Sequence, residues 1–396
     1  MNIFVLNRGS SSIKCNLYTF QTAPRECVPS IWDAHLKWKG IFEEPVLTIK
    51  DAQGKEFTKV LVCKTAVEAL EYLLTSLPQT IDAIVHRIVH GGDWFTQSVF
   101  ITKDVKEKIR LLSELAPLHN LPELEGIEVL ERRFPDIPQI ATFDTAFHYT
   151  LPKYARIYPI PHAWSEEGIR RYGFHGMSFQ YCSQRAAELL RCNLNALKMV
   201  ICHLGSGASL CAIKEGKSID TTMGFTPLDG LMMDTRSGSI DPGIILYLLK
   251  KKTPREISDA LYNSSGLLGV SEFSSDMHDI IERNEANDDR AKLALEVYLH
   301  RLTALIGSML VALEGMDVLV FTAGIGENAP LIRKRACEAF SFLDIEIDPV
   351  LNQLIEKQDR ILSKSTSRVQ VLLIHTQEAY EMAKECWKIM SRNNFV

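Results

Sequence analysis

The chain of 396 residues is long for a single hydrophobic core and predicts two or three domains. Hydrophobic residues make up 46%, charged residues 23% and aromatic residues 8% of the chain, a composition that excludes a disordered, collagen-like or disulfide-scaffold protein. The formal net charge of −5 gives no indication of a nucleic-acid partner or of a charged membrane surface as a partner.

The nine cysteines are scattered and form no C-x-x-C pair, which predicts reduced thiols in a cytoplasmic protein. The beginning of the chain, MNIFVLNRGSSS, has no basic region and no cleavage motif, so we do not interpret it as a signal peptide. The longest nearly apolar stretch, Leu302–Leu313, is too short to span a bilayer. We therefore expect a cytoplasmic protein without a membrane span.

The first part of the chain begins with strands and continues with alternating helices and strands. Apolar runs and two-residue alternation predict strands at Asn2–Asn7, Ser12–Phe20, Val46–Lys50, Glu56–Val62, Ile81–Val89 and Pro138–Phe143. Helical periodicity predicts helices at Thr65–Leu77, Asp104–Leu115 and Leu121–Arg133. This order indicates one mixed α/β domain of about 150 residues.

The same pattern then begins again. Strands are expected at Lys198–His203, Gly207–Lys214, Ser218–Thr222, Met316–Thr322 and Val369–Ile374. Helices are expected at Pro242–Leu249, Pro254–Tyr262, Asp288–Leu313, Asn328–Phe340 and Gln377–Met390. The strand–turn–strand segment VLNRGSSSIKCNLY resembles VICHLGSGASLCAI, and each opens an α/β region. The repetition predicts a duplicated fold that holds a ligand between its halves.

Small-residue turns point to phosphate as that ligand. The chain has no G-x-x-x-x-G-K-[ST] loop, no H-E-x-x-H, no G-x-S-x-G and no protein-kinase H-R-D set. It has glycine- and serine-rich turns beside apolar strands at Gly9–Ser12, Gly205–Ser209 and Gly324–Asn328, where unhindered backbone amides can bind an anion. One such turn alone is usually an ordinary tight turn, but three of them together with Lys14 favour phosphate binding.

Several charged or titratable residues stand where their side chains are displayed. Arg87 interrupts an apolar strand, a costly place for a guanidinium that faces neither an anion nor a carboxylate. Asp144 ends a strand, and Arg236 lies in a turn between apolar segments. His119 and His175 lie in loop-like segments. A buried salt bridge is the simpler interpretation of any one Arg–Asp pair, but together these groups could stabilise a phosphoryl-like transition state.

These residues belong to motifs that resemble the acetate kinase family across the whole chain. The motifs are NRGSSSIK, HRIVHGG, APLHN, FDTAFH, RYGFHG, HLGSGAS, MGFTPLDGLMMDTRSGSIDPG, SGLLG and GIGEN, in the order of the family. The resemblance implies an α/β fold of two duplicated domains, related to actin, Hsp70 and sugar kinases, with an interdomain nucleotide cleft. It implies an N-terminal domain of residues 1–149 with 380–396, a nucleotide-binding domain of residues 150–379, and a homodimer.

The resemblance also implies reversible transfer of the γ-phosphoryl of ATP to a short-chain carboxylate, and a role for each matching residue. Asn7 and Glu378 match the positions that bind magnesium in the family, with manganese as an alternative ion. Catalytic roles fall to Asp144, His175, Arg236 and His119. Arg87 matches the residue that binds the acceptor carboxylate. The positions that line its methyl group are occupied by Val89, Leu118, Phe174 and Pro227. Nucleotide contacts fall to Lys14, Ser10, Ser12, His203, Leu204, Gly205, Ser206, Gly207, Asp276, Met277, His278, Gly324, Ile325, Gly326, Glu327 and Asn328.

Physical chemistry adds one qualification and a substrate preference. Because a carboxylic acid with a pKa of about 4 to 5 is ionised at neutral pH, the acceptor needs no general base. We therefore expect Asp144 to orient a cation or the magnesium water shell rather than to move an obligatory proton. None of the four residues assigned to the methyl site is Ala or Gly, which favours acetate over propionate and disfavours butyrate.

Two alternatives and three departures from the family pattern remain. A propionate or butyrate kinase, and a non-catalytic ATP-binding regulatory protein on the same fold, are the alternatives. Arg8 stands where the family usually has a small residue and either adds a phosphate contact or points to solvent. His278 stands in place of an arginine, and the C-terminal motif reads HTQEAYEMA. Other nucleoside triphosphates or pyrophosphate are conceivable donors, although the GIGEN and HLGSG segments favour ATP.

Overall fold

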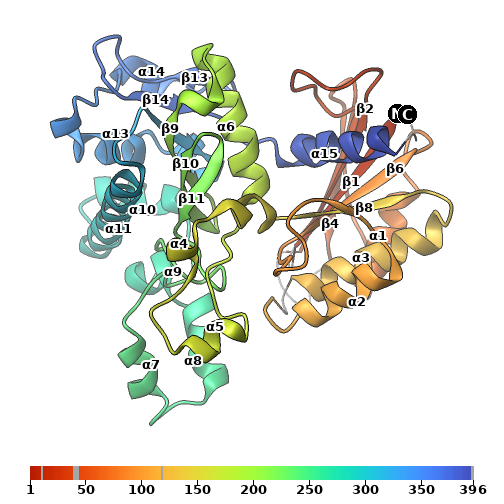
Figure 1. Cartoon of the computed structure of the whole chain (residues 1–396), viewed down its shortest axis with the longest axis horizontal. Coiled ribbons are helices and arrows are strands. Elements are labelled where there is room, and N and C mark those ends of the chain that lie inside the picture. The colour runs from red at the N-terminus through yellow and green to blue at the C-terminus, as the bar shows by residue number, and fades with distance from the viewer. Residues whose placement is uncertain (10–11, 39–43, 117–118, 394–396) are drawn as a thin grey trace. The chain divides into compact units, whose positions relative to one another are not determined.

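The computed structural model describes residues 1–9, 12–38, 44–116 and 119–393 (Figure 1). The contacts within the chain divide it into two units, which are described separately below. Unit 1 comprises Met1–Phe147 and Gln377–Val396, and unit 2 comprises His148–Thr376. These limits lie close to the domain bounds expected from the sequence. The assignment of nucleotide binding to the second domain remains a prediction.

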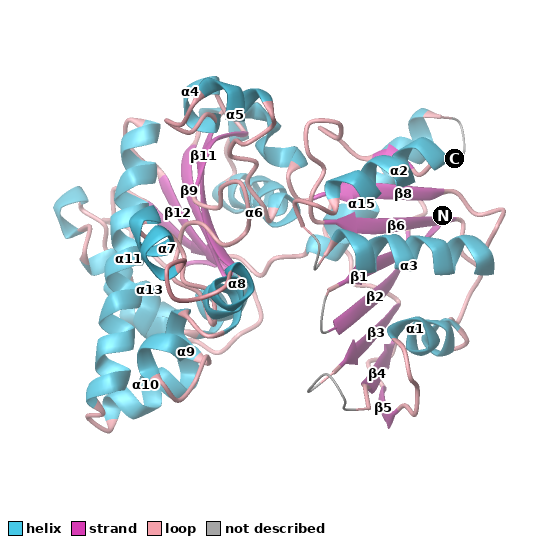
Figure 2. Cartoon of the chain, turned by 90° about the horizontal axis from the view of Figure 1, so that it is seen from below, coloured by secondary structure: helices cyan, strands magenta, loops and turns pink. Residues whose placement is uncertain are grey.

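Unit 1 contains a mixed sheet of eight described strands in the order β5-β4-β3-β2-β1-β6-β8-β7 (Figure 2). The strands are β1 (Asn2–Arg8), β2 (Ser12–Thr19), β3 (Trp32–Lys37), β4 (Val46–Asp51), β5 (Glu56–Val60), β6 (Ala83–Ile88), β7 (Val99–Phe100) and β8 (Gln139–Phe143). Strands β1 to β5 pair as antiparallel neighbours, whereas β1, β6 and β8 are parallel. The carboxyl ends of these three parallel strands therefore meet at one edge of the sheet.

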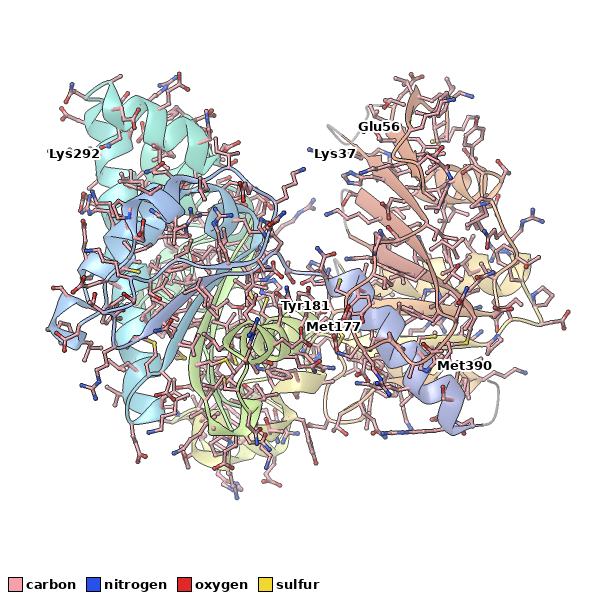
Figure 3. The ribbon with its side chains drawn as sticks, turned by 90° about the horizontal axis from the view of Figure 1, so that it is seen from above. Lys37, Glu56, Met177, Tyr181, Lys292 and Met390 are labelled. Carbon is pink, nitrogen blue, oxygen red and sulfur yellow. The ribbon has the colours of Figure 1, made fainter. Side chains whose placement is uncertain are left out.

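Helices cover the sheet of unit 1. The helices are α1 (Ala66–Leu74), α2 (Lys103–Leu112), α3 (Asn120–Arg133) and α15 (Glu378–Arg392). Phe4 and Leu6 of β1 share a buried cluster with Leu70 of α1 and Leu130 of α3. Helix α15, which carries Met390 (Figure 3), contacts β1, β2, β6 and β8. The C-terminal helix thus completes the core around the first strand of the chain.

Unit 2 repeats the central part of this arrangement. Its sheet has six described strands in the order β11-β10-β9-β12-β14-β13. They are β9 (Lys198–Leu204), β10 (Ala208–Lys214), β11 (Lys217–Thr221), β12 (Val318–Thr322), β13 (Arg360–Ile361) and β14 (Gln370–Leu373). The order β3-β2-β1-β6-β8 in unit 1 corresponds to β11-β10-β9-β12-β14, with antiparallel pairs on one side and parallel pairs on the other. The predicted duplication is confirmed.

Eleven described helices surround or extend from the sheet of unit 2. They are α4 (Lys153–Arg156), α5 (His162–Glu166), α6 (Gly176–Leu190), α7 (Pro242–Leu248), α8 (Pro254–Asn263), α9 (Gly266–Ser271), α10 (Met277–Glu285), α11 (Asp289–Leu313), α12 (Ala323–Asn328), α13 (Pro330–Glu338) and α14 (Pro349–Gln353). Short 3₁₀ turns lie at Ala146–Thr150, Leu194–Ala196 and Ser341–Leu343. Helix α6 contacts β9 and β12 and carries the buried Met177 and Tyr181 (Figure 3).

One helix, α11, is long and apolar enough to cross a membrane by length and composition alone. It is twice as extended as the apolar stretch Leu302–Leu313 seen in the sequence, because the helix begins at Asp289. Asp288 caps its first turn by accepting hydrogen bonds from the next backbone amides. Tyr298 and Leu302 are buried, and the helix contacts β9, β10 and β11. This is the packing of a core helix.

One expectation about local structure was wrong, and some elements were not predicted. The segment Gly324–Asn328 is not an open glycine turn but part of the short helix α12, which starts at Ala323 with a positive φ of 64°. The side chain of Glu327 accepts a hydrogen bond from the Ala323 amide at 2.9 Å and closes this turn. Helix α6 was not predicted, because it shows no clean apolar stripe, and strand β3 was not predicted although its buried Trp32, Ala34 and Leu36 alternate with polar residues.

Candidate active site

In unit 1, three of the predicted site residues meet at the carboxyl ends of the parallel strands. Arg87 lies near the end of β6, Asp144 directly follows β8, and Asn7 lies near the end of β1. The Arg87 guanidinium forms a two-point ion pair with Asp144, with Nε–Oδ1 at 2.9 Å and Nη2–Oδ2 at 2.5 Å. Its Nη1 donates to Asn7 Oδ1 at 3.3 Å. The structure therefore brings together residues that lie up to 137 positions apart in the sequence.

The ion pair is largely shielded from solvent. The side chain of Asp144 is 2% exposed and that of Arg87 is 19% exposed. Burial by itself lowers the pKa of Arg87, but Asp144, Glu378 and Glu123 raise it above its ordinary value. Arg87 thus stays charged and has one edge of its guanidinium committed to Asp144. The partial exposure leaves the group open to a second anion.

Oxygen ligands lie beside this ion pair. Glu378 is the first residue of α15, which packs against β1, β6 and β8, and its charge contributes to the raised pKa of Arg87. Asn7 contributes an amide oxygen. Carboxylate and amide oxygens are the ligand types that Mg²⁺ prefers. The donor set of Asn7 and Glu378 therefore fits the ion that the sequence implied.

Glu123 is a member of this group that the sequence did not reveal. It lies in the first turn of α3, is 2% exposed, and its Oε2 accepts a hydrogen bond from the Val89 amide at 3.0 Å. Burial raises its pKa to about 8, although Arg87, the Val89 amide and Arg8 act in the opposite direction. Its Oε1 has no hydrogen-bond partner among the described residues. No sequence motif marks this contact, because it depends on how α3 packs against β6.

Arg8, for which two roles were open, does not reach solvent. Its side chain packs beside Gly126 of α3 and is almost fully buried, with the residue 5% exposed. Its Nη2 donates to Glu125 Oε2 at 2.6 Å. Its Nη1 has no partner within the parts of the chain that are described. Arg8 thus forms an ion pair with the helix that also carries Glu123.

The remaining predicted residues of unit 1 have varied surroundings. Lys14 is exposed on β2 and pairs in register with Asn7 of β1, while Ser12 begins the same strand. Val89 is buried directly after β6, and His119 precedes α3. Ser10 and Leu118 lie outside the described residues.

In unit 2, two predicted histidines stack on one another. The rings of His175 and His203 lie with their centroids 4.1 Å apart and their planes 19° apart. His175 Nδ1 lies 2.9 Å from Ser209 Oγ, and His203 Nδ1 lies 2.8 Å from Ser178 Oγ. His175 adopts a left-handed conformation with φ of 59°, an uncommon conformation for a residue with a side chain. Ser209, the stacked ring of His203 and a strained backbone thus hold the His175 imidazole at the start of α6.

Arg236 lies on a loop whose backbone is hydrogen-bonded to Leu261 of α8 and to Ser265, which precedes α9. Its Nη1 donates to the Pro227 carbonyl at 3.2 Å, and its guanidinium lies 6.0 Å from the centre of the Tyr262 ring. Burial lowers its pKa. A side chain on Gly207 would lie 3.5 Å from Arg236 and 3.4 Å from His175. Arg236, His175 and the glycine turn after β9 are therefore neighbours, and Gly207 leaves room between them.

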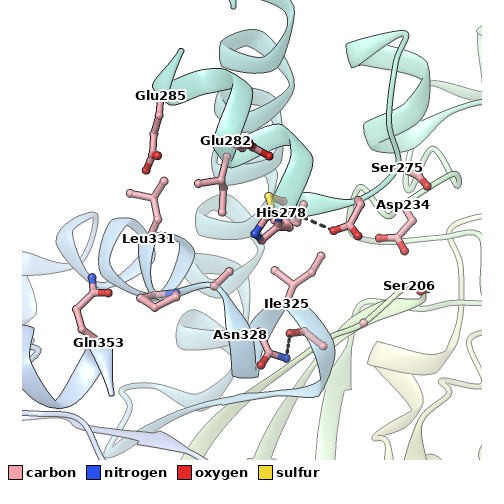
Figure 4. A pocket seen from close by; sticks show the side chains of 17 residues that line it. Ser206, Asp234, Ser275, His278, Glu282, Glu285, Ile325, Asn328, Leu331 and Gln353 are labelled. Atoms are coloured by element: carbon pink, nitrogen blue, oxygen red, sulfur yellow. Dashed lines mark hydrogen bonds between the residues drawn. The ribbon is translucent and has the colours of Figure 1, made fainter. Parts of the chain in front are cut away.

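A pocket of about 880 Å³ opens beside these residues in unit 2 (Figure 4). Its lining consists of glycine-rich segments and helix ends: Gly205, Ser206, Asp234, Ser275, Asp276, Met277, His278, Ile281, Glu282, Glu285, Gly324, Ile325, Asn328, Ala329, Pro330, Leu331 and Gln353. Ser206 and Asp234 lie at one end, and Leu331, Gln353 and Glu285 at the other (Figure 4). The size is that of a small-molecule or cofactor site.

Eight of the predicted nucleotide residues line this pocket. They are Gly205, Ser206, Asp276, Met277, His278, Gly324, Ile325 and Asn328. His203, Leu204, Gly207, Gly326 and Glu327 belong to the same two segments but do not line it. Asp276 caps α10, because its side chain accepts a hydrogen bond from the His278 amide at 2.9 Å. The exposed side chain of His278 lies in the wall of the pocket. Asp234 was missed by sequence reasoning; burial raises its pKa, opposed by a hydrogen bond with Ser206.

Phe174 and Pro227, predicted for the methyl site, are both buried in unit 2. The Phe174 carbonyl lies 2.8 Å from His148 Nε2, so its backbone is tied to the segment that begins the unit. Their placement around a methyl group together with residues of unit 1 stays a prediction.

A duplicated sheet of the actin-like type, a pocket between glycine-rich segments, and separate cation groups in the two units define a phosphotransferase. The comparisons with known proteins agree. A family model described as the Acetokinase family matches residues 2–384. The chain belongs to this family, whose members are kinases that use a carboxyl group as acceptor.

Individual relatives cover the chain from end to end. The acetate kinase of Microcystis aeruginosa is 50% identical over 401 residues, covering 98% of this chain and 100% of that protein. The acetate kinase of Trichormus variabilis is 46% identical over 406 residues, covering 99% and 100%. Among solved structures, Porphyromonas gingivalis acetate kinase has a TM-score of 0.89 at 35% identity, covering 98% and 99%. A propionate kinase from Francisella tularensis has a TM-score of 0.89 at 38% identity, covering 97% and 98%.

Proposed function

We propose that the protein is an acetate kinase, which transfers the γ-phosphoryl of ATP to acetate by direct in-line displacement and gives acetyl phosphate and ADP. The observation that carries the proposal is the partly exposed Arg87 guanidinium, held by Asp144 and Asn7 at the carboxyl ends of three parallel strands. Full-length relatives named acetate kinase, 45 to 50% identical, support the same reaction.

In unit 1, the residues bind the acceptor and neutralise its charge. Arg87 presents donors to the acetate carboxylate, and Asp144 fixes the plane of the guanidinium. Because acetate is already ionised, no residue needs to remove a proton from it. Asp144, ion-paired to Arg87, then acts as an orienting carboxylate. His119, at the start of α3, is proposed as a further active-site residue, and Lys14 as a phosphate contact.

In unit 2, the residues bind the donor and offset charge on the transferring group. The Gly205–Gly207 and Gly324–Asn328 segments provide backbone amides and space for the nucleotide. His175 and Arg236 are proposed to donate hydrogen bonds to the equatorial oxygens of the phosphoryl group. The strained backbone of His175 and its contact with Ser209 support a fixed imidazole.

A divalent cation is the proposed cofactor. Asn7 and Glu378 are the residues that would hold Mg²⁺, directly or through water, and Mn²⁺ is an alternative ion of similar preference. When bound with ATP, the ion neutralises charge on the phosphate oxygens. Arg87, which donates a hydrogen bond to Asn7, keeps this metal-binding side chain beside the proposed site of the acetate carboxylate.

Acetate is the proposed acceptor because the described residues assigned to its methyl group, Val89, Phe174 and Pro227, are bulky and buried. Val89 is 4% exposed and Phe174 is 1% exposed. Propionate is the second candidate, supported by the likeness to a propionate kinase structure. One additional methylene changes binding by about 1–3 kcal/mol, so propionate should react with reduced efficiency.

Trapping of the acyl phosphate with hydroxylamine tests the reaction and its acceptor together. Purified protein is incubated with Mg-ATP and acetate, propionate or butyrate, and the hydroxamate is measured. The strongest signal is expected with acetate. A stronger signal with a longer acid would move the substrate assignment, and no signal with any acid would contradict the kinase proposal. Pyrophosphate and GTP in place of ATP test the donor, because His278 replaces an arginine there.

The protein is also proposed to be a cytoplasmic homodimer. No residue of helix α7 is buried, and it presents apolar side chains: Ile244, Leu246, Tyr247 and Leu249 lie at or just beyond it with 43–67% exposure. An apolar patch of this kind is typical of a protein–protein interface. None of the nine cysteines, all of which lie in the described residues, forms a disulfide, which supports a reducing compartment. Light scattering of the wild-type protein and of Leu246→Glu tests the dimer.

A further inference from the structure

The largest fully buried side chain among the described residues is a guanidinium outside the catalytic groups. Arg333 of α13 is 1% exposed. Within the described parts of the chain it forms no ion pair with a carboxylate, although an unpaired buried charge is costly. Burial, followed by the nearby Arg360, lowers its pKa to about 10, so the guanidinium stays protonated at neutral pH. Its hydrogen-bond partners among the described residues are neutral oxygens of Gly326, Glu327 and Asn352, next to residues that line the pocket of unit 2.

Four hydrogen bonds hold Arg333 in place. Nη1 donates to the carbonyls of Gly326 at 2.8 Å and Glu327 at 2.9 Å. Nε donates to Asn352 Oδ1 at 2.8 Å, and Nη2 donates to the Asn352 carbonyl at 2.6 Å. Asn352 is itself 2% exposed, and its Nδ2 donates a hydrogen bond to the carbonyl of Pro330 at 3.0 Å. The pair thus joins α12, α13 and α14.

The carbonyls that Arg333 binds are the ones that a helix cannot satisfy internally. Gly326 and Glu327 lie in the last turn of α12, where backbone carbonyls lack intrahelical donors and carry the negative end of the helix dipole. A cation placed there both satisfies these oxygens and fixes the end of the helix. The planar fork of a guanidinium allows four bonds in a defined geometry, which an ammonium cannot reproduce.

The segments joined in this way form much of the pocket wall. Gly324, Ile325 and Asn328 of α12 line the pocket, as do Ala329, Pro330 and Leu331 at the start of α13. Gln353, next to Asn352, lines it opposite Leu331 (Figure 4). Arg333 and Asn352 themselves do not line the pocket. Their contacts therefore act on the ligand only through the residues that they hold.

We propose that Arg333 and Asn352 are positioning residues for the phosphoryl donor, which hold Gly324–Leu331 and Gln353 in the geometry that binds the nucleotide. The proposal rests on the proposed function in one respect, that this pocket binds ATP and ADP. It assigns to the pair an effect on donor affinity and none on acceptor affinity. A residue that only stabilised unit 2 would not separate the two substrates.

The test measures binding and kinetics separately in Arg333→Lys, Asn352→Ala and the double variant. Binding of ADP is measured by titration calorimetry below the unfolding transition, and KM is measured for ATP and for acetate. For Arg333→Lys we expect the ADP Kd and the ATP KM to rise at least about tenfold, with the acetate KM unchanged within about twofold. Because both residues act through one hydrogen-bond network, the rise of the ADP Kd in the double variant should be smaller than the product of the rises in the two single variants.

The matched control is Arg335→Lys. Arg335 lies on the same helix, but its side chain is 39% exposed and pairs with Glu296 at the surface. This variant should bind ADP as the wild type does. If Arg333→Lys does not fold, Asn352→Ala alone carries the test, with a smaller rise of the ADP Kd in the same direction.

The outcomes separate this proposal from the proposed function. If the wild-type protein binds no ADP or ATP, the pocket assignment fails and the positioning proposal fails with it. If the wild type binds ADP and the folded variants bind it equally well, the positioning proposal alone is wrong. A parallel rise of the KM values for ATP and acetate would also overturn it, because that result indicates a general loss of structure.

Discussion

Arg87 and Asp144 form a two-point ion pair that joins neighbouring parallel strands at their carboxyl ends, with nitrogen–oxygen distances of 2.9 and 2.5 Å. Both oxygens of Asp144 are occupied by one guanidinium, and the carboxylate is almost fully buried. Each oxygen therefore already accepts a hydrogen bond from Arg87, and this two-point geometry fixes the plane of the guanidinium. The geometry therefore favours an orienting role for Asp144 over proton transfer.

The Asp144→Asn variant tests this role. Replacing one oxygen by an amide nitrogen removes the charge and breaks the two-point pair, so Arg87 is no longer held in its plane. We expect kcat to fall about 10²- to 10³-fold. Small acids and bases such as formate or imidazole should not restore activity in steady-state assays. Restoration by such proton carriers would instead assign Asp144 an obligatory proton transfer.

Glu123 predicts a pH-dependent stability. Its pKa is raised to about 8, chiefly by burial, so the folded state holds the proton more tightly than the unfolded chain does. The stability contributed by this group is complete below the ordinary carboxyl pKa of about 4.3 and is lost as the pH rises through about 8. Over that window the free energy of unfolding should fall by up to about 1.4 kcal/mol per pH unit.

Urea denaturation at several pH values checks this prediction in the wild type and in Glu123→Gln. The glutamine variant should lose the slope between pH 5.5 and 8.5. The control is Glu131→Gln, which changes an exposed carboxylate on the same helix. Equal slopes in the wild type and in Glu123→Gln would show that Glu123 does not titrate in this range.

The Arg8–Glu125 pair predicts two substitutions with unequal effects. Arg8 is buried with one nitrogen lacking a described partner, whereas the Glu125 side chain is 55% exposed. Arg8→Met removes an incompletely satisfied buried charge and should change the free energy of unfolding by less than about 1 kcal/mol. Glu125→Gln leaves that charge buried without its partner and should destabilise by about 1–2 kcal/mol. Chemical denaturation measures both, and a larger loss for Arg8→Met than for Glu125→Gln would contradict this account.

His175 predicts an effect on the chemical step rather than on binding. Its imidazole is held by Ser209 and by stacking on His203. His175→Ala should lower kcat about 10²-fold with a small change in the KM for ATP, and Ser209→Ala should lower kcat about tenfold because the ring loses its anchor. His300→Ala, which changes an exposed histidine of α11, is the control. A rise in KM at constant kcat would indicate a binding role instead.

The elements that could be predicted are those whose local pattern matches their burial. Strands β1 and β9 are continuous apolar runs in the middle of their sheets. Each is followed by a similar glycine-containing turn and a second strand, and this similarity indicated the duplication. Strand β3, WDAHLK, does alternate apolar and polar residues, with Trp32, Ala34 and Leu36 buried, so its pattern was sufficient to predict it. Helix α6 is buried on several sides, so its polar and small residues do not form one stripe. Local patterns could therefore have identified β3 but not α6.

The candidate site divides in the same way. Arg87, Asp144, His175 and Arg236 stand in motifs or interrupt apolar runs, and these signals are local. Glu123, Asp234 and Arg333 could not be identified, because their importance comes from contacts between segments far apart in the sequence. A buried charge is visible in a structure through its surroundings, whereas in the sequence Arg333 is one arginine in the basic run IRKR.

The most direct test of the account is the KM for acetate and for ATP in Arg87→Lys, measured from acetyl hydroxamate formation beside the wild type. Lysine keeps the positive charge near Asp144 but cannot bind two carboxylates with a planar fork. The account predicts that the acetate KM rises about 10- to 100-fold while the ATP KM stays within about threefold. An unchanged acetate KM, or an equal rise for both substrates, would contradict the assignment of Arg87 as the residue that binds the acceptor.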